Sequence, residues 1–192
     1  MSNGIKVKKR NGSIESLNLE KMHVMVEEAT QDLAGVSASQ VEIQSGIQFY
    51  DGITTEEIQE ILIKSASDLI SLDNPNYQFV AARLLLFALR KSLYGKIREL
   101  PHLENHINSC VAKDAYDNEI YSKYSKEEIE KVNSYIDHDR DFLFTYAGLR
   151  QVVDKYLVQD RSTGGVYETP QFMYIMIALT IFQNYPKEKR LD

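Results

Sequence analysis

The chain has 192 residues, 43% of them hydrophobic and 26% charged, with a formal net charge of -6. This composition is typical of a globular protein of one domain or two small ones, and the acidic balance argues against a general nucleic-acid or membrane-surface binder. The only cysteine, Cys110, excludes an internal disulfide, a four-cysteine zinc site and a redox dithiol. We therefore expect a cytoplasmic protein with no nucleic-acid or membrane partner.

A cluster of cations opens the chain. Four of them lie between Lys6 and Arg10, just before Asn11-Gly12, and no acidic residue occurs before Glu15. Asn-Gly between two short alternating segments is typical of a β-hairpin with a type I′ turn, in which both central residues have positive φ. The sequence therefore predicts a small basic hairpin that is suited to contact with phosphate.

Two helices are predicted after the hairpin. The first begins at Asn18, a good N-cap residue, and ends at Gly35. The second begins at Ser37, with Gln40 at the spacing of a capping box, and reaches about Phe49.

Two further helices complete the first half. A turn at Asp51-Gly52 precedes a Thr54–Glu57 capping box, which opens the third helix. The fourth begins at Asn74-Pro75, with proline in its first position, and ends before Gly95. Residues 1–95 are therefore expected to form one domain.

The second half changes character at Pro101, after which tyrosines become frequent. A Ser125–Glu128 capping box and residues 146–156 predict two helices, and residues 156–160 and 166–168 predict a second β-hairpin. Thr169-Pro170 then opens a last helix, residues 171–183, that is apolar nearly all round. Such a helix is normally buried, and it is too short to span a membrane. Because only nine residues follow it, we expect a partner or a continuation of the chain to cover it.

Some polar groups in the second half have simple structural interpretations. His102 and His106 have the i,i+4 spacing of metal ligands, but no third ligand is evident. The run 137–141 lacks the spacing of a calcium loop, so we expect a charged loop or cap. Cys110 is expected to be a buried apolar side chain. No metal site is predicted.

The basic start of the chain is a candidate polyphosphate site. Lys9 and Arg10 supply charge, and the helix that begins at Asn18 supplies oriented N–H donors. Lys21 lies in the first turn of that helix and opposes its dipole, which a bound anion would compensate. The alternative is a solvated basic turn without a ligand.

Three residues farther along the chain can add to such a site. Thr55 and Gln59 share a helical face and can hydrogen-bond to a base or ribose. Lys91 lies in the last turn of its helix, where a cation also simply complements the dipole. Each is equally compatible with an ordinary structural role.

Taken together, these residues resemble a known module. Val7-x-Lys9-Arg10-x-Gly12-x-x-Glu15-x-x-Asn18-x-x-Lys21 is similar to the opening of an ATP-cone, and so are Gly52-Ile53-Thr54-Thr55-x-x-Ile58 and Ala81-Ala82-Arg83-(x)₇-Lys91. The ATP-cone is the allosteric nucleotide-binding module at the N-terminus of many ribonucleotide reductases. Residues 137–141, 155–158 and 167–172 resemble the segment after the cone in the large (alpha) subunit of class Ia reductases, of bacterial or phage type.

The resemblance implies an allosteric site for ATP as activator or dATP as inhibitor, with Mg²⁺. The residues implied to line it are Val7, Lys9, Arg10, Glu15, Asn18, Lys21, Thr55, Gln59 and Lys91. Its cations would hold the triphosphate, while Glu15, Asn18 and Thr55 would orient base and sugar. Bacterial relatives often carry histidine in place of Gln59 and of Ala88, so the response to dATP stays open.

The resemblance also implies a role in deoxyribonucleotide synthesis for DNA replication, through reduction of ribonucleoside diphosphates. That reaction needs a thiyl-radical cysteine, a reducing cysteine pair and a shuttle pair, whereas Cys110 is the only cysteine of the chain. We therefore expect a segment that is inactive alone, either truncated or one piece of a split large subunit. The implied partners are the remainder of the large subunit and the small radical-generating subunit.

The expected fold is mainly α with small β. Residues 1–95 form an ATP-cone, in which a small sheet caps a four-helix unit. Residues 96–192 form a helical lead-in, with a β-hairpin, to a reductase α/β barrel that is absent from the chain. Two other functions stay open: a stand-alone nucleotide-sensing module, and a degenerate cone kept for packing or assembly. ATP-cone repressors are disfavoured because the cysteines of their zinc ribbon are missing.

Overall fold

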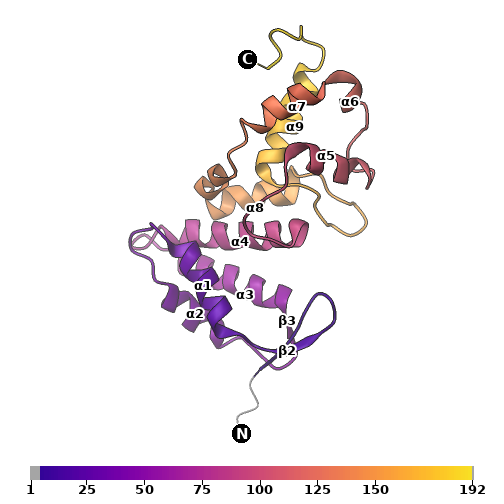
Figure 1. Ribbon diagram of the computed structural model, residues 1–192. Helices are drawn as coiled ribbons and strands as arrows, with labels where there is room; N and C mark the ends of the chain where they lie inside the picture. Colours follow the sequence, from indigo (N-terminus) through magenta and orange to yellow (C-terminus); the bar gives the residue numbers. More distant parts are fainter. Residues whose placement is uncertain (1–4, 192) are drawn as a thin grey trace. The chain divides into compact units, whose positions relative to one another are not determined.

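The computed structural model describes residues 5–191 (Figure 1). The chain divides into two compact units. The first takes in the chain up to Ala88 together with Phe142–Arg150, and the second takes in Leu89–Asp141 and the chain from Gln151 onward. The described residues are mainly helical with one small sheet, so the expected fold class is confirmed.

The sheet of the first unit has three short strands in the order β2-β1-β3. β1 (Lys6–Lys8) pairs antiparallel with β2 (Ile14–Ser16) and parallel with β3 (Ile53–Thr54). The middle strand buries Val7, which is the register partner of the buried Ile53. β3 directly follows the predicted turn at Asp51-Gly52, and the sequence predicts no strand there because a two-residue strand is too short to show an alternating pattern.

The predicted hairpin is confirmed, but its predicted turn type is wrong. Gly12 has φ +82°, whereas Asn11 is not among the described residues with positive φ. The loop instead holds three residues between Lys9 and Ser13, whose backbones are joined by a 2.8 Å hydrogen bond from Lys9 N to Ser13 O. Asn11 Oδ1 accepts from the backbone N–H of Ser13 at 3.0 Å, and this local bond favours the wider loop over a two-residue turn.

Helix α1 (Leu19–Thr30) begins at the predicted N-cap Asn18 but ends before the predicted Gly35. The reason is a contact from a distant helix. The guanidinium of Arg83 donates to the carbonyl oxygens of Ala29 and Gln31, at 3.3 and 2.6 Å, and so satisfies the carbonyls at the end of α1.

The predicted capping box at the start of α2 (Ala38–Gly46) is wrong. Ser37 is the N-cap, but its side chain makes no capping hydrogen bond. The hydroxyl of Tyr77 accepts from the Ser37 N–H at 3.0 Å and donates to the Gln40 side chain. Tyr77 opens α4 (Tyr77–Tyr94), which therefore starts two residues after the predicted Pro75. Helix α3 (Thr55–Asp68) begins where the sequence predicts it.

Helices α1, α2 and α3 bury one face each, whereas α4 has no exposed residue before Lys91. Their buried apolar side chains include Val26, Val41, Leu62, Ile63, Val80 and Leu86. This burial is the main source of stability for helices of this length, because isolated helices shorter than about 12–15 residues are marginal in water.

The second unit is built from short helices around one apolar cluster. Its elements are α5 (Leu103–Val111), α6 (Ile120–Lys123), α7 (Lys126–Asn133), part of a 3-10 helix (His138–Leu143), part of α8 (Tyr146–Lys155) and α9 (Pro170–Phe182). Leu103, Ile107, Ile129 and Phe172 lie at the centre of the cluster. The predicted Ser125–Glu128 capping box is confirmed.

The second predicted hairpin forms only in part. Within residues 156–168 a single isolated bridge joins Gln159 to Val166, with no strand on either side. The carboxylate of Glu168 accepts from the backbone N–H of Val158 at 2.8 Å. The Glu168 side chain thus replaces the backbone acceptor that a paired strand would offer to Val158, and the β-ladder ends there.

Helix α9 is apolar on all sides, as predicted, but only one face of it is covered. Phe172, Met173 and Leu179 are buried, whereas Ile177 and Ile181 are 48% and 62% exposed. Within residues 5–191, no helix combines the length and the apolar character needed to cross a membrane.

Candidate functional site

The small sheet brings the loop of the hairpin and the start of α3 to the same place. Lys8 is the register partner of Thr54, so the residues that follow each of them lie at the same end of the sheet. Lys9 and Arg10 continue from β1 into the loop, and Thr55 is the first residue of α3. The topology therefore unites three of the predicted site residues from two segments that are far apart in the chain.

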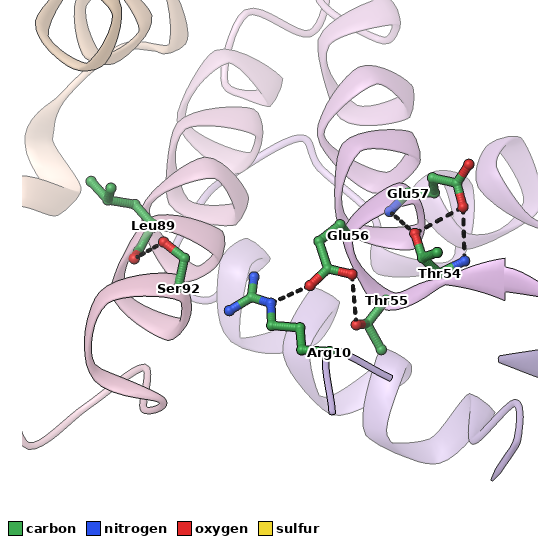
Figure 2. Close-up of polar contacts among 7 residues, drawn as sticks. All are labelled: Arg10, Thr54, Thr55, Glu56, Glu57, Leu89 and Ser92. Atoms are coloured by element: carbon green, nitrogen blue, oxygen red, sulfur yellow. Dashed lines mark hydrogen bonds and ion pairs between the residues drawn. The ribbon is translucent and has the colours of Figure 1, made fainter. Parts of the chain in front are cut away.

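Arg10 contacts α3 directly, through an acidic residue to which the sequence analysis assigned no role. The guanidinium Nε of Arg10 donates to Glu56 Oε1, and Thr55 Oγ1 donates to Glu56 Oε2 at 3.1 Å (Figure 2). Partial burial is the largest single influence on Glu56 and opposes its ionisation. The hydrogen bonds from Arg10, from the backbone and from Thr55, together with the charge of Arg10, outweigh it, so the pKa of Glu56 is lowered. Both Arg10 and Thr55 are thus held by one carboxylate.

The adjacent acid, Glu57, has a different and purely local role. Its Oε2 accepts from the backbone N–H and the hydroxyl of Thr54, both at 2.8 Å, and the Glu57 N–H donates back to Thr54 Oγ1 (Figure 2). This is the predicted capping box, which is confirmed. The bonds from Thr54 and from the Tyr50 hydroxyl lower the pKa of Glu57. The first turn of α3 is thereby fixed.

Lys9 and Glu15, both predicted to be site residues, pair with each other. Their Nζ and Oε2 atoms are 3.3 Å apart, with side chains 35% and 57% exposed. Val7 differs from them because its side chain is only 3% exposed and packs into the core. The hairpin therefore has its charged groups at the surface, and the buried side chain of Val7 anchors it to the core.

Asn18 and Lys21 lie toward the other end of β1. Leu17 N donates to Ile5 O, so the chain enters α1 beside the start of the central strand. Asn18 Oδ1 accepts from the Lys21 N–H at 2.9 Å, which is the expected capping bond. Lys21 itself is exposed, in the first turn of α1.

The two remaining predicted residues lie on helices of different units. Gln59 is one turn beyond Thr55 on α3 and is only 8% exposed. Lys91 lies in the last turn of α4, within the second unit, where its charge complements the helix dipole.

Glu56 is the residue of this site that sequence reasoning missed. The available signal was weak, because acidic side chains are common in the first turn of any helix. Its partner Arg10 is 46 residues away in the chain, so nothing local could indicate the pair.

In the second unit, the two histidines with the spacing of metal ligands have structural roles. His102 is the N-cap of α5 and accepts from the Glu104 N–H at 3.3 Å. His106 stacks on Phe172, with ring centroids 4.0 Å apart, and hydrogen-bonds to the Tyr116 hydroxyl at 3.0 Å. Burial lowers the pKa of His106 to about 4, so its ring is neutral. No group of acids, histidines and cysteine among residues 5–191 is arranged to hold a metal ion.

Two further groups complete this buried polar cluster. The Tyr116 hydroxyl donates to Glu168, whose pKa is raised by burial. Cys110 is buried as predicted, and burial raises the pKa of its thiol to about 11. A neutral, enclosed thiol of this kind is a packing group rather than a nucleophile.

The acidic run 137–141 is partly the cap that the sequence predicts. Asp137 Oδ1 accepts from the Asp139 N–H at 3.0 Å, at the start of the 3-10 helix. Asp141 differs from this prediction because it is buried and forms an ion pair with the buried Arg90, at 3.3 Å. Burial outweighs the attraction of Arg90 and raises the pKa of Asp141 to about 6.

Comparison with known proteins agrees with this architecture. Residues 5–92 match the ATP cone domain, and residues 142–192 match the all-alpha domain of ribonucleotide reductase. The basic hairpin against four helices therefore corresponds to the ATP cone domain, and the last part of the chain is similar to the all-alpha domain of ribonucleotide reductase.

Relatives narrow this assignment to one kind of subunit. The chain is 49% identical, over all of its length, to the alpha subunit of ribonucleoside-diphosphate reductase 1 from Escherichia coli, and 46% identical to the alpha subunit from Haemophilus influenzae. It is 42% identical, over 96% of its length, to the alpha subunit of Enterobacteria phage T4. The chain thus matches the N-terminal region of ribonucleotide reductase alpha subunits and spans about a quarter of the length of these relatives.

Proposed function

We propose that residues 1–95 bind ATP or dATP, with Mg²⁺, and that this binding regulates a ribonucleoside-diphosphate reductase. The observation that carries the proposal is the meeting of the basic loop with the first turn of α3. There Arg10 and Thr55 share the carboxylate of Glu56, within a domain that matches the ATP cone over residues 5–92. Guanidinium and ammonium groups next to a helix start provide both charge and oriented donors for phosphate.

The nine residues named from the sequence are the proposed site. Lys9, Arg10, Lys21 and Lys91 supply positive charge for the phosphates, and Glu15, Asn18 and Thr55 supply hydrogen bonds for base and ribose. The buried Gln59 suits a contact with an enclosed part of the ligand rather than with its phosphates, because it is only 8% exposed. Val7 contributes by fixing the central strand on which the loop is mounted.

Catalysis is proposed to lie outside these residues. Reduction of a ribonucleotide needs two electrons from a cysteine pair, and this chain has a single cysteine whose thiol is buried. Residues 96–192 are proposed as the start of the catalytic domain. The exposed side chains of α9, among them Ile177 and Ile181, are proposed to pack against the remainder of the large subunit. The small radical-generating subunit is the second proposed partner, and the cytoplasm is the proposed location.

Calorimetric titration of the purified chain with dATP and then ATP, in magnesium buffer, tests the proposal. We expect micromolar or tighter binding. Lys9→Ala and Lys91→Ala should each weaken it tenfold or more, which is about 1.4 kcal/mol for a charge-assisted contact. Lys64→Ala is the matched control, because Lys64 lies on α3 in an exposed pair with Asp68 and outside the proposed site.

Two outcomes would contradict the proposal. Unchanged affinity in both site variants would remove these lysines from the site. No heat with either nucleotide, from a sample with the expected helical circular dichroism, would mean that the domain serves only packing and assembly.

A further inference from the structure

The carboxylate of Glu56 occupies the place of an anion at the proposed nucleotide site. Its two oxygens take a hydrogen bond each from Arg10 Nε and Thr55 Oγ1, which are two of the groups proposed to meet the nucleotide (Figure 2). Carboxylate and phosphate oxygens are interchangeable acceptors for a guanidinium and a hydroxyl. Glu56 therefore satisfies the same donors that a ligand would use.

We propose that Glu56 is a built-in competitor for the nucleotide: it holds Arg10 and Thr55 in the empty site and must give way when a phosphate binds. The inference rests on the proposed function and adds a regulatory residue to that site. The affinity for nucleotide then depends on how much more strongly Arg10 and Thr55 bind phosphate than they bind the carboxylate of Glu56, which is always present. A tethered carboxylate of this kind raises the apparent dissociation constant of the nucleotide by a constant factor, because only the fraction of molecules with Glu56 displaced can bind it.

The exposure of the pair makes such an exchange feasible. The side chains of Arg10 and Glu56 are 41% and 45% exposed, so water can replace each partner as the pair separates. Exposed ion pairs contribute little net free energy, whereas a triphosphate brings several negative charges to the same cation. Displacement therefore favours the more highly charged ligand.

The neighbouring Glu57 shows that the first turn of α3 does not depend on Glu56. Glu57 closes the capping box with Thr54 and accepts from the Tyr50 hydroxyl at 2.7 Å. Since the cap is complete without Glu56, this side chain can rotate away without unwinding the helix. Glu57 thus caps the helix, whereas Glu56 determines whether Arg10 and Thr55 are available to a ligand.

The test compares Glu56→Gln with Glu57→Gln in the full 192-residue chain. Both variants remove one negative charge from the same helical turn, and glutamine at position 57 can still complete the capping box. ATP and ADP are titrated by calorimetry into each protein, with Mg²⁺ and again with EDTA. Circular dichroism verifies that the helices are retained.

We expect Glu56→Gln to tighten ATP binding by about three- to tenfold, with a smaller gain for ADP, because the tethered charge no longer competes. Glu57→Gln should stay within about twofold of the parent, since it changes only the weaker long-range charge. The gain at position 56 should shrink as salt is raised.

Other outcomes would overturn the proposal. Equal ATP affinity in the parent and in Glu56→Gln means that the carboxylate does not compete. Weaker binding in Glu56→Gln that occurs only with Mg²⁺ means that Glu56 is a ligand of the metal–nucleotide complex. If neither protein binds ATP, dATP or ADP, the proposed function itself fails, which separates that failure from one confined to Glu56.

Discussion

The two units hold their charged side chains in contrasting environments. In the first, the pairs Arg10–Glu56 and Lys9–Glu15 lie at the surface, with side chains between 35% and 57% exposed. In the second, Arg90 and Asp141 keep 3% and 0% of their side-chain area exposed. Charges that water can reach are able to exchange partners, whereas enclosed charges cannot be solvated when their pair separates. The contrast separates a surface suited to a ligand from a polar cluster that fixes packing.

The largest effect is expected where a buried partner is removed. Arg90→Met leaves the Asp141 carboxyl and the His138 carbonyl oxygen without their buried donor. We expect the free energy of unfolding to fall by about 3–5 kcal/mol, measured by urea unfolding. Hydrogen exchange should localise the loss to residues 89–141. A change below about 1 kcal/mol would show that this pair resembles the exposed ones.

A second, smaller effect is expected from acid. The pKa of His106 is about 4 in the folded chain and 6.5 when unperturbed, so the unfolded state binds more protons between these values. Its contribution to stability is complete above pH 6.5 and is lost as the pH falls toward 4. Asp141 and Glu168 act in the opposite direction because their pKa values are raised.

Comparison with His106→Gln isolates the histidine, because those acids are present in both proteins. Between pH 6.5 and 4 the parent should lose up to about 3 kcal/mol more stability than the variant. Parallel stability curves for the two proteins would show that His106 is not held neutral by burial. The absolute stability of the variant is not diagnostic, since the stacking on Phe172 changes as well.

The smallest effect is expected at an ordinary surface pair. Lys64 and Asp68 lie four residues apart on α3, with 66% and 44% of their side chains exposed. Lys64→Ala should change the free energy of unfolding by less than about 0.5 kcal/mol. Thermal melts at low and high salt measure the change. A larger, salt-sensitive loss of stability would contradict the expectation that exposed ion pairs contribute less to stability than buried ones.

Features that depend on residues close in the chain could be predicted from the sequence. The capping boxes Thr54–Glu57 and Ser125–Glu128 formed as predicted, because both partners lie within one turn. The Ser37–Gln40 pattern is equally good in the sequence. It failed because the Tyr77 hydroxyl, 40 residues away from Ser37, accepts from the Ser37 N–H and donates to the Gln40 side chain that would otherwise accept this bond.

In the candidate site, too, features set by nearby residues could be predicted, whereas contacts between distant residues could not. Its cations and helix starts follow from composition and capping, and the family resemblance supplies the rest of the residue list. The pair between Arg10 and Glu56 needs the parallel pairing of β1 with β3, and a two-residue strand leaves no pattern in the sequence. The same holds for the end of α1, which a distant Arg83 determines.

The position of β1 in the middle of the sheet has a consequence for the order of folding. Its pairing with β2 spans a short loop, whereas its pairing with β3 must wait until α1 and α2 have brought residues 53 and 54 alongside. Contacts between residues close in the chain form sooner than those that close long loops. We therefore expect the hairpin to form early and the parallel edge late, so that the loop cations meet the first turn of α3 only when the rest of the unit is in place.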